Sequence, residues 1–256
     1  MKRIFKPKMM SNLSDSYTEI NDDRDLYLTG EITVESVGDL IKAINDINSD
    51  DNYLTKYYAV TNCDYNPAPI NIYINSVGGD VMAAMSLITT IENSLTPVHT
   101  HCIGEASSAG LLIFITGHKR IGYKSSMFMY HELSSGSIGK LKDLEESVEV
   151  WKQMQKNIDE IFTTYTKFTQ EELDEIRSYK KDFTFYYKEA IEKGILDQVI
   201  LSSKYTKDLA ELKSSGVVVK TSNTDELDKL VEQLTDEELI EALKEYINSK
   251  EILIIE

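Results

Sequence analysis

The sequence predicts an α/β fold built on a largely parallel sheet. Residues 70–94 and 98–116 each run from a β-branched strand through a tight glycine turn into an apolar helical pattern. Repetition of strand, turn and helix is typical of βαβ units, whose strands are parallel and whose crossovers are right-handed. A third observation is the apolar period of three and four residues that continues through 140–165 and predicts one long amphipathic helix.

The first part of the chain is expected to hold a strand, a helix and a long connection. Leu26 and Leu28 alternate with exposed positions over 25–30, which predicts a strand that ends at a glycine turn. Residues 34–47 carry apolar side chains at a helical period. Residues 48–69 are polar and contain two prolines, and we expect them to form an exposed insertion.

The later part of the chain is expected to complete the sheet. A short apolar strand at 127–130 precedes a loop rich in serine and glycine. Thr169 and Glu172 form a capping-box pattern that predicts the start of a helix. A short helix at 187–193 ends in a glycine, and a final strand follows at 195–200.

Composition limits the class of protein. The chain has 256 residues and a net charge of −16, which argues against binding to nucleic acid or to an anionic membrane. Two cysteines fit a reducing compartment, and the basic N-terminus lacks the apolar segment of a secretory signal. No apolar stretch approaches the ~18 residues of a membrane span. We therefore expect a cytoplasmic protein.

The chain divides into three parts by pattern. Residues 1–23 are polar and unpatterned, and we expect a flexible N-terminal arm. Residues 24–200 carry the predicted core of the fold. Residues 201–256 are expected to form an acidic helical extension, because the last 36 residues hold 11 acidic residues against 3 lysines and include a second capping box.

The four histidines differ in their settings. His99 and His101 point to the same face of a strand, but no third metal ligand is evident nearby. His118 falls in a polar turn and reads as a surface residue. His131 ends an apolar strand before a loop, which is typical of catalytic residues in α/β folds and equally compatible with a structural role.

Two small-residue turns could take part in acyl chemistry. Ser107 and Ser108 lie where a strand meets a helix, so each could be a nucleophile or an ordinary helix cap. Gly78 and Gly79 follow another strand and could form an oxyanion hole or a simple tight turn. Phosphate binding is disfavoured there, because Asp80 follows and no P-loop pattern is present.

Five segments, in the same order, resemble the signatures of one protease family. Residues 72–80 contain Tyr-Ile-Asn-Ser-Val-Gly-Gly, which is similar to the Y-I-N-S-P-G-G signature of the Clp protease proteolytic subunit (ClpP) family. The other segments are similar to the family patterns at the first strand, the nucleophile, the histidine and the end of the core: Arg24 with Leu28-Thr29-Gly30, 103–110, 129–132, and Asp182 with 189–197. Together the segments span 177 residues, from 24 to 200.

The resemblance implies both a fold and a reaction. The fold would be the ClpP/crotonase-like spiral of repeated ββα units, with 140–165 as a long protruding handle helix. The reaction would be hydrolysis of peptide bonds by a serine endopeptidase through an acyl-enzyme. The implied residues are Ser108 as nucleophile, His131 as general base, Asp182 as orienting acid, Gly79 and Ala109 as oxyanion hole, and Gly78, Val77 and Leu133 in substrate binding.

The resemblance also implies partners. Family members form homo-oligomers of stacked heptameric rings, and an ATP-driven unfoldase ring feeds unfolded proteins or peptides into the enclosed chamber. The chain has no nucleotide-binding motif, so ATP would belong to the unfoldase and no cofactor or metal is expected in this subunit.

Several positions depart from the family pattern. Proline is replaced by Val77 and by Leu133, methionine by Ala109, and arginine by Phe183. The N-terminal arm does not resemble the gating loops of the family, which leaves unfoldase docking open. Usage rich in Lys, Asn, Ile and Tyr suggests an AT-rich genome and leaves a phage-encoded origin open. Three alternatives remain: a non-catalytic structural subunit of a ClpP-type ring, a crotonase-type acyl-CoA enzyme, and a phage capsid-maturation protease.

Overall fold

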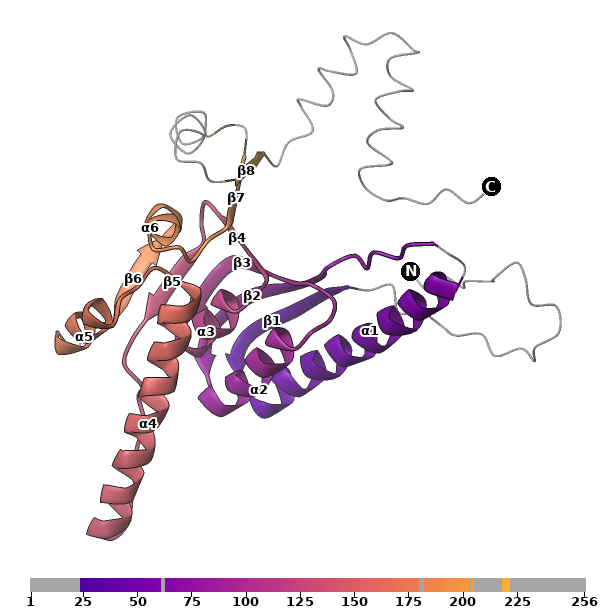
Figure 1. Ribbon diagram of the computed structural model, residues 1–256. Coiled ribbons are helices and arrows are strands. Elements are labelled where there is room, and N and C mark those ends of the chain that lie inside the picture. Colours follow the sequence, from indigo (N-terminus) through magenta and orange to yellow (C-terminus); the bar gives the residue numbers. More distant parts are fainter. Residues whose placement is uncertain (1–23, 61–62, 180–181, 203, 205–217, 222–256) are drawn as a thin grey trace.

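The computed structural model describes residues 24–60, 63–179, 182–202, 204 and 218–221 (Figure 1). The helices are α1 (Val34–Val60), α2 (Val81–Glu92), α3 (Ala109–Ile115), α4 (Leu141–Tyr165), α5 (Gln170–Ser178) and α6 (Tyr187–Glu192). The strands are β1 (Asp25–Ile32), β2 (Ile70–Gly79), β3 (Val98–Ser107), β4 (Lys119–Tyr123), β5 (Met127–Tyr130), β6 (Phe183–Tyr186), β7 (Gln198–Leu201) and β8 (Val218–Thr221). The predicted arm at 1–23 and most of the predicted extension at 201–256 lie outside the described residues.

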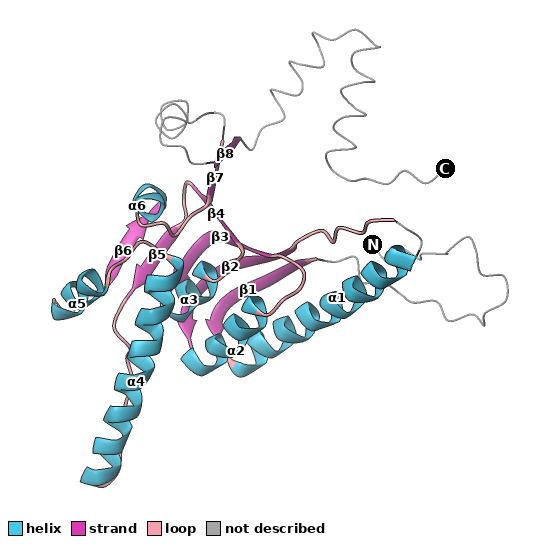
Figure 2. Cartoon of the chain, in the orientation of Figure 1, coloured by secondary structure: helices cyan, strands magenta, loops and turns pink. Residues whose placement is uncertain are grey.

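The described strands form one sheet that is parallel in nearly every pairing. The order β1-β2-β3-β4-β7-β8 is parallel throughout. β5 pairs in parallel with the end of β3 and antiparallel with β6. Figure 2 shows α1, α2 and α3 on one face of this sheet. The predicted α/β class with a mainly parallel sheet is therefore confirmed.

The alternating burial of side chains along β2 explains why helices pack against one face of the sheet. Ile70, Ile72 and Ile74 are fully buried on the helix side, while the residues between them are partly exposed. Asp80 then begins α2 as its N-cap, since its carboxylate accepts hydrogen bonds from the N–H groups of Met82 and Ala83 at 2.8 and 3.0 Å. The strand therefore passes into the helix without an intervening loop.

β3 changes partner along its length, and this change determines what lies at its end. Residues 99–102 pair with β4, whereas residues 105–107 pair with β5 and place Ser107 beside Met129. β5 also pairs with β6 in a register that sets Tyr130 opposite Phe183. This register brings the start of β6, which follows Asp182, beside the end of β5, which precedes His131. The end of β3, the end of β5 and the start of β6 therefore lie side by side in the sheet.

A cluster of aromatic side chains packs around β5 and β6. The ring centroids of Phe114 and Phe128 lie 5.2 Å apart, and those of Phe128 and Phe185 lie 5.7 Å apart. Tyr130 packs edge-on against Phe162 of α4 at 4.7 Å. All five side chains are buried, so they hold rigidly the strand that ends at Tyr130, just before His131.

The insertion expected at 48–69 is in fact helical as far as Val60, because α1 continues through it. The polar pattern is misleading at Asp51, which is only 3% exposed. Its carboxylate accepts hydrogen bonds from Arg24, Thr96 and Tyr65. An acidic residue can face the core of a helix when its charge and its acceptor sites are fully paired.

Three short strands were not predicted. β4 and β6 are too brief to show a clear period in the sequence. β8 lies inside the extension that was expected to be helical, and it adds to the sheet in parallel with β7. Its sequence Val-Val-Lys-Thr is mostly β-branched, which favours a strand. The sheet therefore extends beyond the predicted boundary at residue 200.

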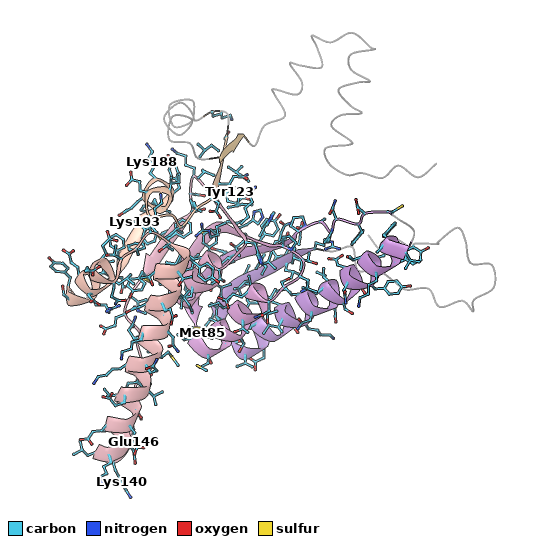
Figure 3. The ribbon with its side chains drawn as sticks, in the orientation of Figure 1. Met85, Tyr123, Lys140, Glu146, Lys188 and Lys193 are labelled. Atoms are coloured by element: carbon cyan, nitrogen blue, oxygen red, sulfur yellow. The ribbon has the colours of Figure 1, made fainter. Side chains whose placement is uncertain are left out.

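The predicted long helix is confirmed as α4, and it projects away from the sheet. Figure 3 shows Lys140 and Glu146 near its far end, distant from the body of the molecule. Its buried residues, Ile158, Asp159 and Phe162, all lie in its last third. Toward the far end of the helix apolar side chains are exposed: Leu141 is 72% exposed and Val150 is 60% exposed.

Candidate active site

Ser108 occupies a sharp turn between β3 and α3. Its φ of 53° makes it the only non-glycine residue with positive φ in the described part of the chain, a conformation that costs roughly 1–2 kcal/mol. Its N–H donates to the carbonyl of Met129 at 2.8 Å, which holds the turn against β5. The side chain makes no capping bond to α3. The interpretation of Ser108 as an ordinary helix cap is therefore wrong.

The imidazole ring of His131 contacts the hydroxyl of Ser108. Its Nε2 lies 2.8 Å from Ser108 Oγ, and its Nδ1 lies 2.6 Å from the carbonyl oxygen of Glu132. A carbonyl can only accept, so Nδ1 carries the proton and Nε2 offers a lone pair to the serine hydroxyl. This tautomer is the one that can remove a proton from Ser108.

Asp182 and His131 adjoin the paired ends of β6 and β5, but they do not hydrogen-bond to each other within the described residues. Its side chain is exposed and lines a separate cavity of about 370 Å³ between α5 and β6, with Phe168, Tyr179 and Lys193 among its neighbours. The contact expected between Asp182 and His131 Nδ1 is made instead by the Glu132 carbonyl. A main-chain acceptor of this kind leaves no signal in the sequence.

Gly78 and Gly79 allow the end of β2 to reach the serine turn. Their φ angles are +100° and +147°. A Cβ on Gly78 would lie 2.7 Å from Ser108 Cβ, and a Cβ on Gly79 would lie 2.4 Å from the carbonyl oxygen of Ile32. The N–H of Gly78 donates to Ser76 Oγ at 3.1 Å, so this donor is already engaged.

A cavity of about 160 Å³ opens beside Ser108. Among the residues predicted for substrate binding, Leu133 lines this cavity, Gly78 packs against Ser108, and Val77 is 60% exposed and lies outside the cavity lining. The predicted oxyanion residues Gly79 and Ala109 also line the cavity, together with Val81, Leu112, Tyr130, His131, Ser134, Ile158 and Phe162. The walls are mainly apolar, as is usual for ligand sites.

A buried polar network behind this cavity was not foreseen from the sequence. Asp159 of α4 accepts hydrogen bonds from Gln155 Nε2 at 2.8 Å and from Arg177 Nη1 at 2.7 Å. Arg177 also donates to the hydroxyl of Tyr130, the residue before His131, at 2.9 Å. Burial, with a further contribution from Asp159, raises the pKa of Tyr130 to about 12, so its hydroxyl stays neutral. The spacing of Gln155 and Asp159 was the only available signal.

Other nucleophiles near the site are engaged or unreactive. Ser107 is fully buried and its hydroxyl donates to Glu105 at 2.6 Å. Burial raises the pKa of the Cys102 thiol to about 12, which keeps it protonated. Of the two serines considered from the sequence, only Ser108 therefore meets a base.

Of His99 and His101, the pair considered as metal ligands, His101 is packed among other side chains. His101 is buried against the ring of Tyr73, with centroids 4.6 Å apart, and its Nε2 lies 3.3 Å from Asn71 Oδ1. Burial lowers the pKa of His101 to about 4. Within the described ranges, no three His, Cys, Asp or Glu side chains come together as metal ligands. Nor does any helix of the described chain have the length and apolar character needed to cross a membrane.

A serine hydroxyl in contact with a histidine ring nitrogen, on a tight strand-to-helix turn beside a cavity, is an arrangement typical of serine hydrolases. The family model for Clp protease matches residues 8–203 of the chain. The chain belongs to the Clp protease family and is a serine-type peptidase, as the five sequence segments predicted.

Relatives with related names span most of the chain. It is 31% identical over 196 residues to the ATP-dependent Clp protease proteolytic subunit 2 of Chlamydia trachomatis, covering 76% of this chain and 89% of that protein. The corresponding subunit of Chlamydia muridarum matches at the same identity and coverage. The proteolytic subunit of Deinococcus radiodurans is 32% identical over 133 residues, covering 51% of this chain and 64% of that protein.

Proposed function

We propose that this peptidase cleaves peptide bonds through an acyl-enzyme on Ser108, with His131 as the general base. The single observation that carries the proposal is the 2.8 Å contact between Ser108 Oγ and His131 Nε2, in a tautomer fixed by the Glu132 carbonyl. A serine hydroxyl becomes an effective nucleophile only when a neighbouring base removes its proton.

The reaction follows from this placement. Ser108 Oγ attacks the carbonyl carbon of the substrate while its proton passes to His131 Nε2, and the carbonyl oxygen becomes an oxyanion. The N–H groups of Gly79 and Ala109 border the cavity and bind that oxyanion, each contributing roughly 3–4 kcal/mol of barrier reduction. His131 then protonates the leaving amine, and water, activated by the same histidine, releases the acid. No cofactor takes part in these steps.

Asp182 supplies negative charge to the histidine in this proposal. The β5–β6 register, which pairs Tyr130 with Phe183, supports this role, because His131 and Asp182 are the next residues along the two segments. A carboxylate at that position stabilises the imidazolium that forms when His131 takes the proton. The Glu132 carbonyl then orients the ring, and Asp182 stabilises its charge.

The peptidase works as an oligomer with an ATP-driven partner in this proposal. The relatives are named as proteolytic subunits of an ATP-dependent protease. The projecting α4 carries apolar side chains with no cover in the described chain, including Leu141, Val148 and Val150. We expect these to be buried between subunits, as in the stacked heptameric rings implied by the family resemblance, with the active sites facing an enclosed chamber.

Covalent labelling tests the nucleophile directly. A fluorescent fluorophosphonate should label the wild-type chain and fail to label Ser108→Ala, which should also lose hydrolysis of a fluorogenic peptide. Ser107→Ala is the matched control, because Ser107 is adjacent but bonded to Glu105, and it should still be labelled. Labelling that persists in Ser108→Ala, or an assembled wild type that takes no label, would contradict the proposal. Light scattering on the same samples tests the oligomer, and a monomer at micromolar concentration would count against the chamber.

A further inference from the structure

The peptide group between Glu132 and Leu133 is held at both ends. Its carbonyl accepts from His131 Nδ1 at 2.6 Å, and its N–H donates to Gln155 Oε1 of α4 at 2.8 Å. A peptide group is planar, so its N–H and C=O directions cannot turn independently. Fixing the N–H therefore fixes the direction in which the carbonyl meets His131.

Gln155 is itself held by a buried carboxylate. Its Nε2 donates to Asp159 Oδ1 at 2.8 Å, one helical turn further along α4. Asp159 is 5% exposed, and it also accepts from Arg177 at 2.7 Å and from Gln170 at 2.9 Å. Because an ionised carboxylate can only accept, it requires the NH₂ end of the Gln155 amide. The carbonyl end of that amide must then face Leu133.

The donor at residue 133 is a departure from the family pattern described in the sequence analysis. Proline, which the resembling family has at this position, carries no N–H and could not bond to Gln155. Leu133 supplies the N–H and also lines the cavity beside Ser108. The amide of Gln155 therefore contacts the segment that carries the base without entering the cavity itself.

We propose that Gln155, oriented by Asp159, is a positioning residue of the peptidase reaction: it fixes the Glu132–Leu133 peptide so that its carbonyl holds His131 toward Ser108. This inference rests on the proposed function of Ser108 and His131. Gln155 does not line the cavity beside Ser108, so its effect passes through the Glu132–Leu133 peptide, with a longer contact of 3.4 Å to the hydroxyl of Tyr130 beside it.

The test measures how fast a fluorophosphonate labels Ser108 in the full-length chain. Gln155→Leu keeps the approximate size of the side chain and removes its hydrogen bonds to Leu133, Asp159 and Tyr130. It should lower the labelling rate constant and kcat by roughly 10–100-fold and leave KM within twofold, because misplacing a catalytic group affects chemistry more than binding. Gln153→Leu is the matched control: it lies on the same helix, is exposed, and bonds only to Asn157 in the described chain.

A donor–acceptor exchange provides the second arm. Gln155→Glu retains an acceptor for Leu133 but sets a second carboxylate against Asp159, and it should be slow. Adding Asp159→Asn restores a donor opposite that carboxylate, so the double variant should recover at least tenfold over Gln155→Glu alone. A merely structural role would not produce rescue of kcat at constant KM.

The outcomes separate the two proposals. If the wild type is not labelled, the assignment of Ser108 fails. If the wild type is labelled and Gln155→Leu reacts within twofold of it, the role of Gln155 is refuted while that of Ser108 stands. If Gln155→Leu does not fold, by circular dichroism and light scattering, the exchange pair decides: rescue supports the role of Gln155, and equal slowness of single and double variants refutes it.

Discussion

Gly78 is the backbone position on which the serine turn depends most directly. A Cβ added there would lie 2.7 Å from Ser108 Cβ and 2.9 Å from the carbonyl oxygen of Ser107, and the residue has a φ of +100°. The substitution Gly78→Ala therefore introduces both a strained backbone and a collision with the nucleophile. Gly30 offers the matched control, since its φ is +80° but no atom lies within 4 Å of an added Cβ.

The two effects have different sizes. Backbone strain costs roughly 1–2 kcal/mol for an L-residue at positive φ, and it applies to Gly78→Ala and to Gly30→Ala alike. The collision applies only to Gly78→Ala, because an ordinary contact begins near 3.4 Å and about 0.7 Å must be recovered by moving Ser108 away. A displacement approaching 1 Å at a reacting atom lowers the rate by about 100-fold.

Urea denaturation and fluorophosphonate labelling together measure both effects. We expect Gly30→Ala to lose about 1–2 kcal/mol of unfolding free energy with normal labelling. Gly78→Ala should lose more stability and label Ser108 about 100-fold more slowly. Equal labelling rates for the two variants would refute the argument that Gly78 leaves space for the nucleophile.

Two further predictions concern stability. Burial holds the pKa of His101 at about 4 in the folded protein against an ordinary value of 6.5, so the unfolded chain binds the proton first as pH falls. The unfolding free energy should therefore be intact above pH 6.5 and fall by up to about 3 kcal/mol between pH 6.5 and 4, and His101→Gln should show a flatter profile over that range in urea titrations. Arg24→Ala removes the ionic partner of Asp51, whose side chain is 4% exposed, and should cost about 3–5 kcal/mol. Adding Asp51→Asn should recover part of that loss in thermal unfolding, and a lack of recovery would show that the charge of Asp51 is not what Arg24 balances.

Much of the fold could be predicted because its strands and helices are locally periodic. The isoleucines of β2 and the stripe of α4 have clear periods of two and of three to four. α1 could not be followed to Val60, because the residue that faces the core there is Asp51, and only its partners from distant segments make it compatible with burial. Among the short strands, β5 and β7 were predicted because they are mainly apolar, whereas β4 and β8 contain Lys or Arg, and β6 is interrupted by Thr184, so these three were missed.

The site could be predicted as far as side chains determine it. Ser108 and His131 stand in recognisable segments, but their 2.8 Å contact depends on the change of partner along β3, which the sequence did not predict. The role of Asp182 stays a prediction, since its side chain lies toward a different cavity. The Glu132 carbonyl and the Gln155 amide could not be found in advance, because backbone direction and amide orientation depend on tertiary contacts.

The acceptor beside His131 belongs to the main chain, and this affects how the site can change by mutation. Every amino acid at position 132 supplies the same carbonyl oxygen, so no single codon change there deletes it. Variation at 132 can therefore accumulate while the histidine keeps its acceptor. Mutations that disturb this acceptor would instead fall at positions distant in sequence, such as Gln155 and Asp159. A comparison of related sequences that is limited to the segment around His131 would miss them.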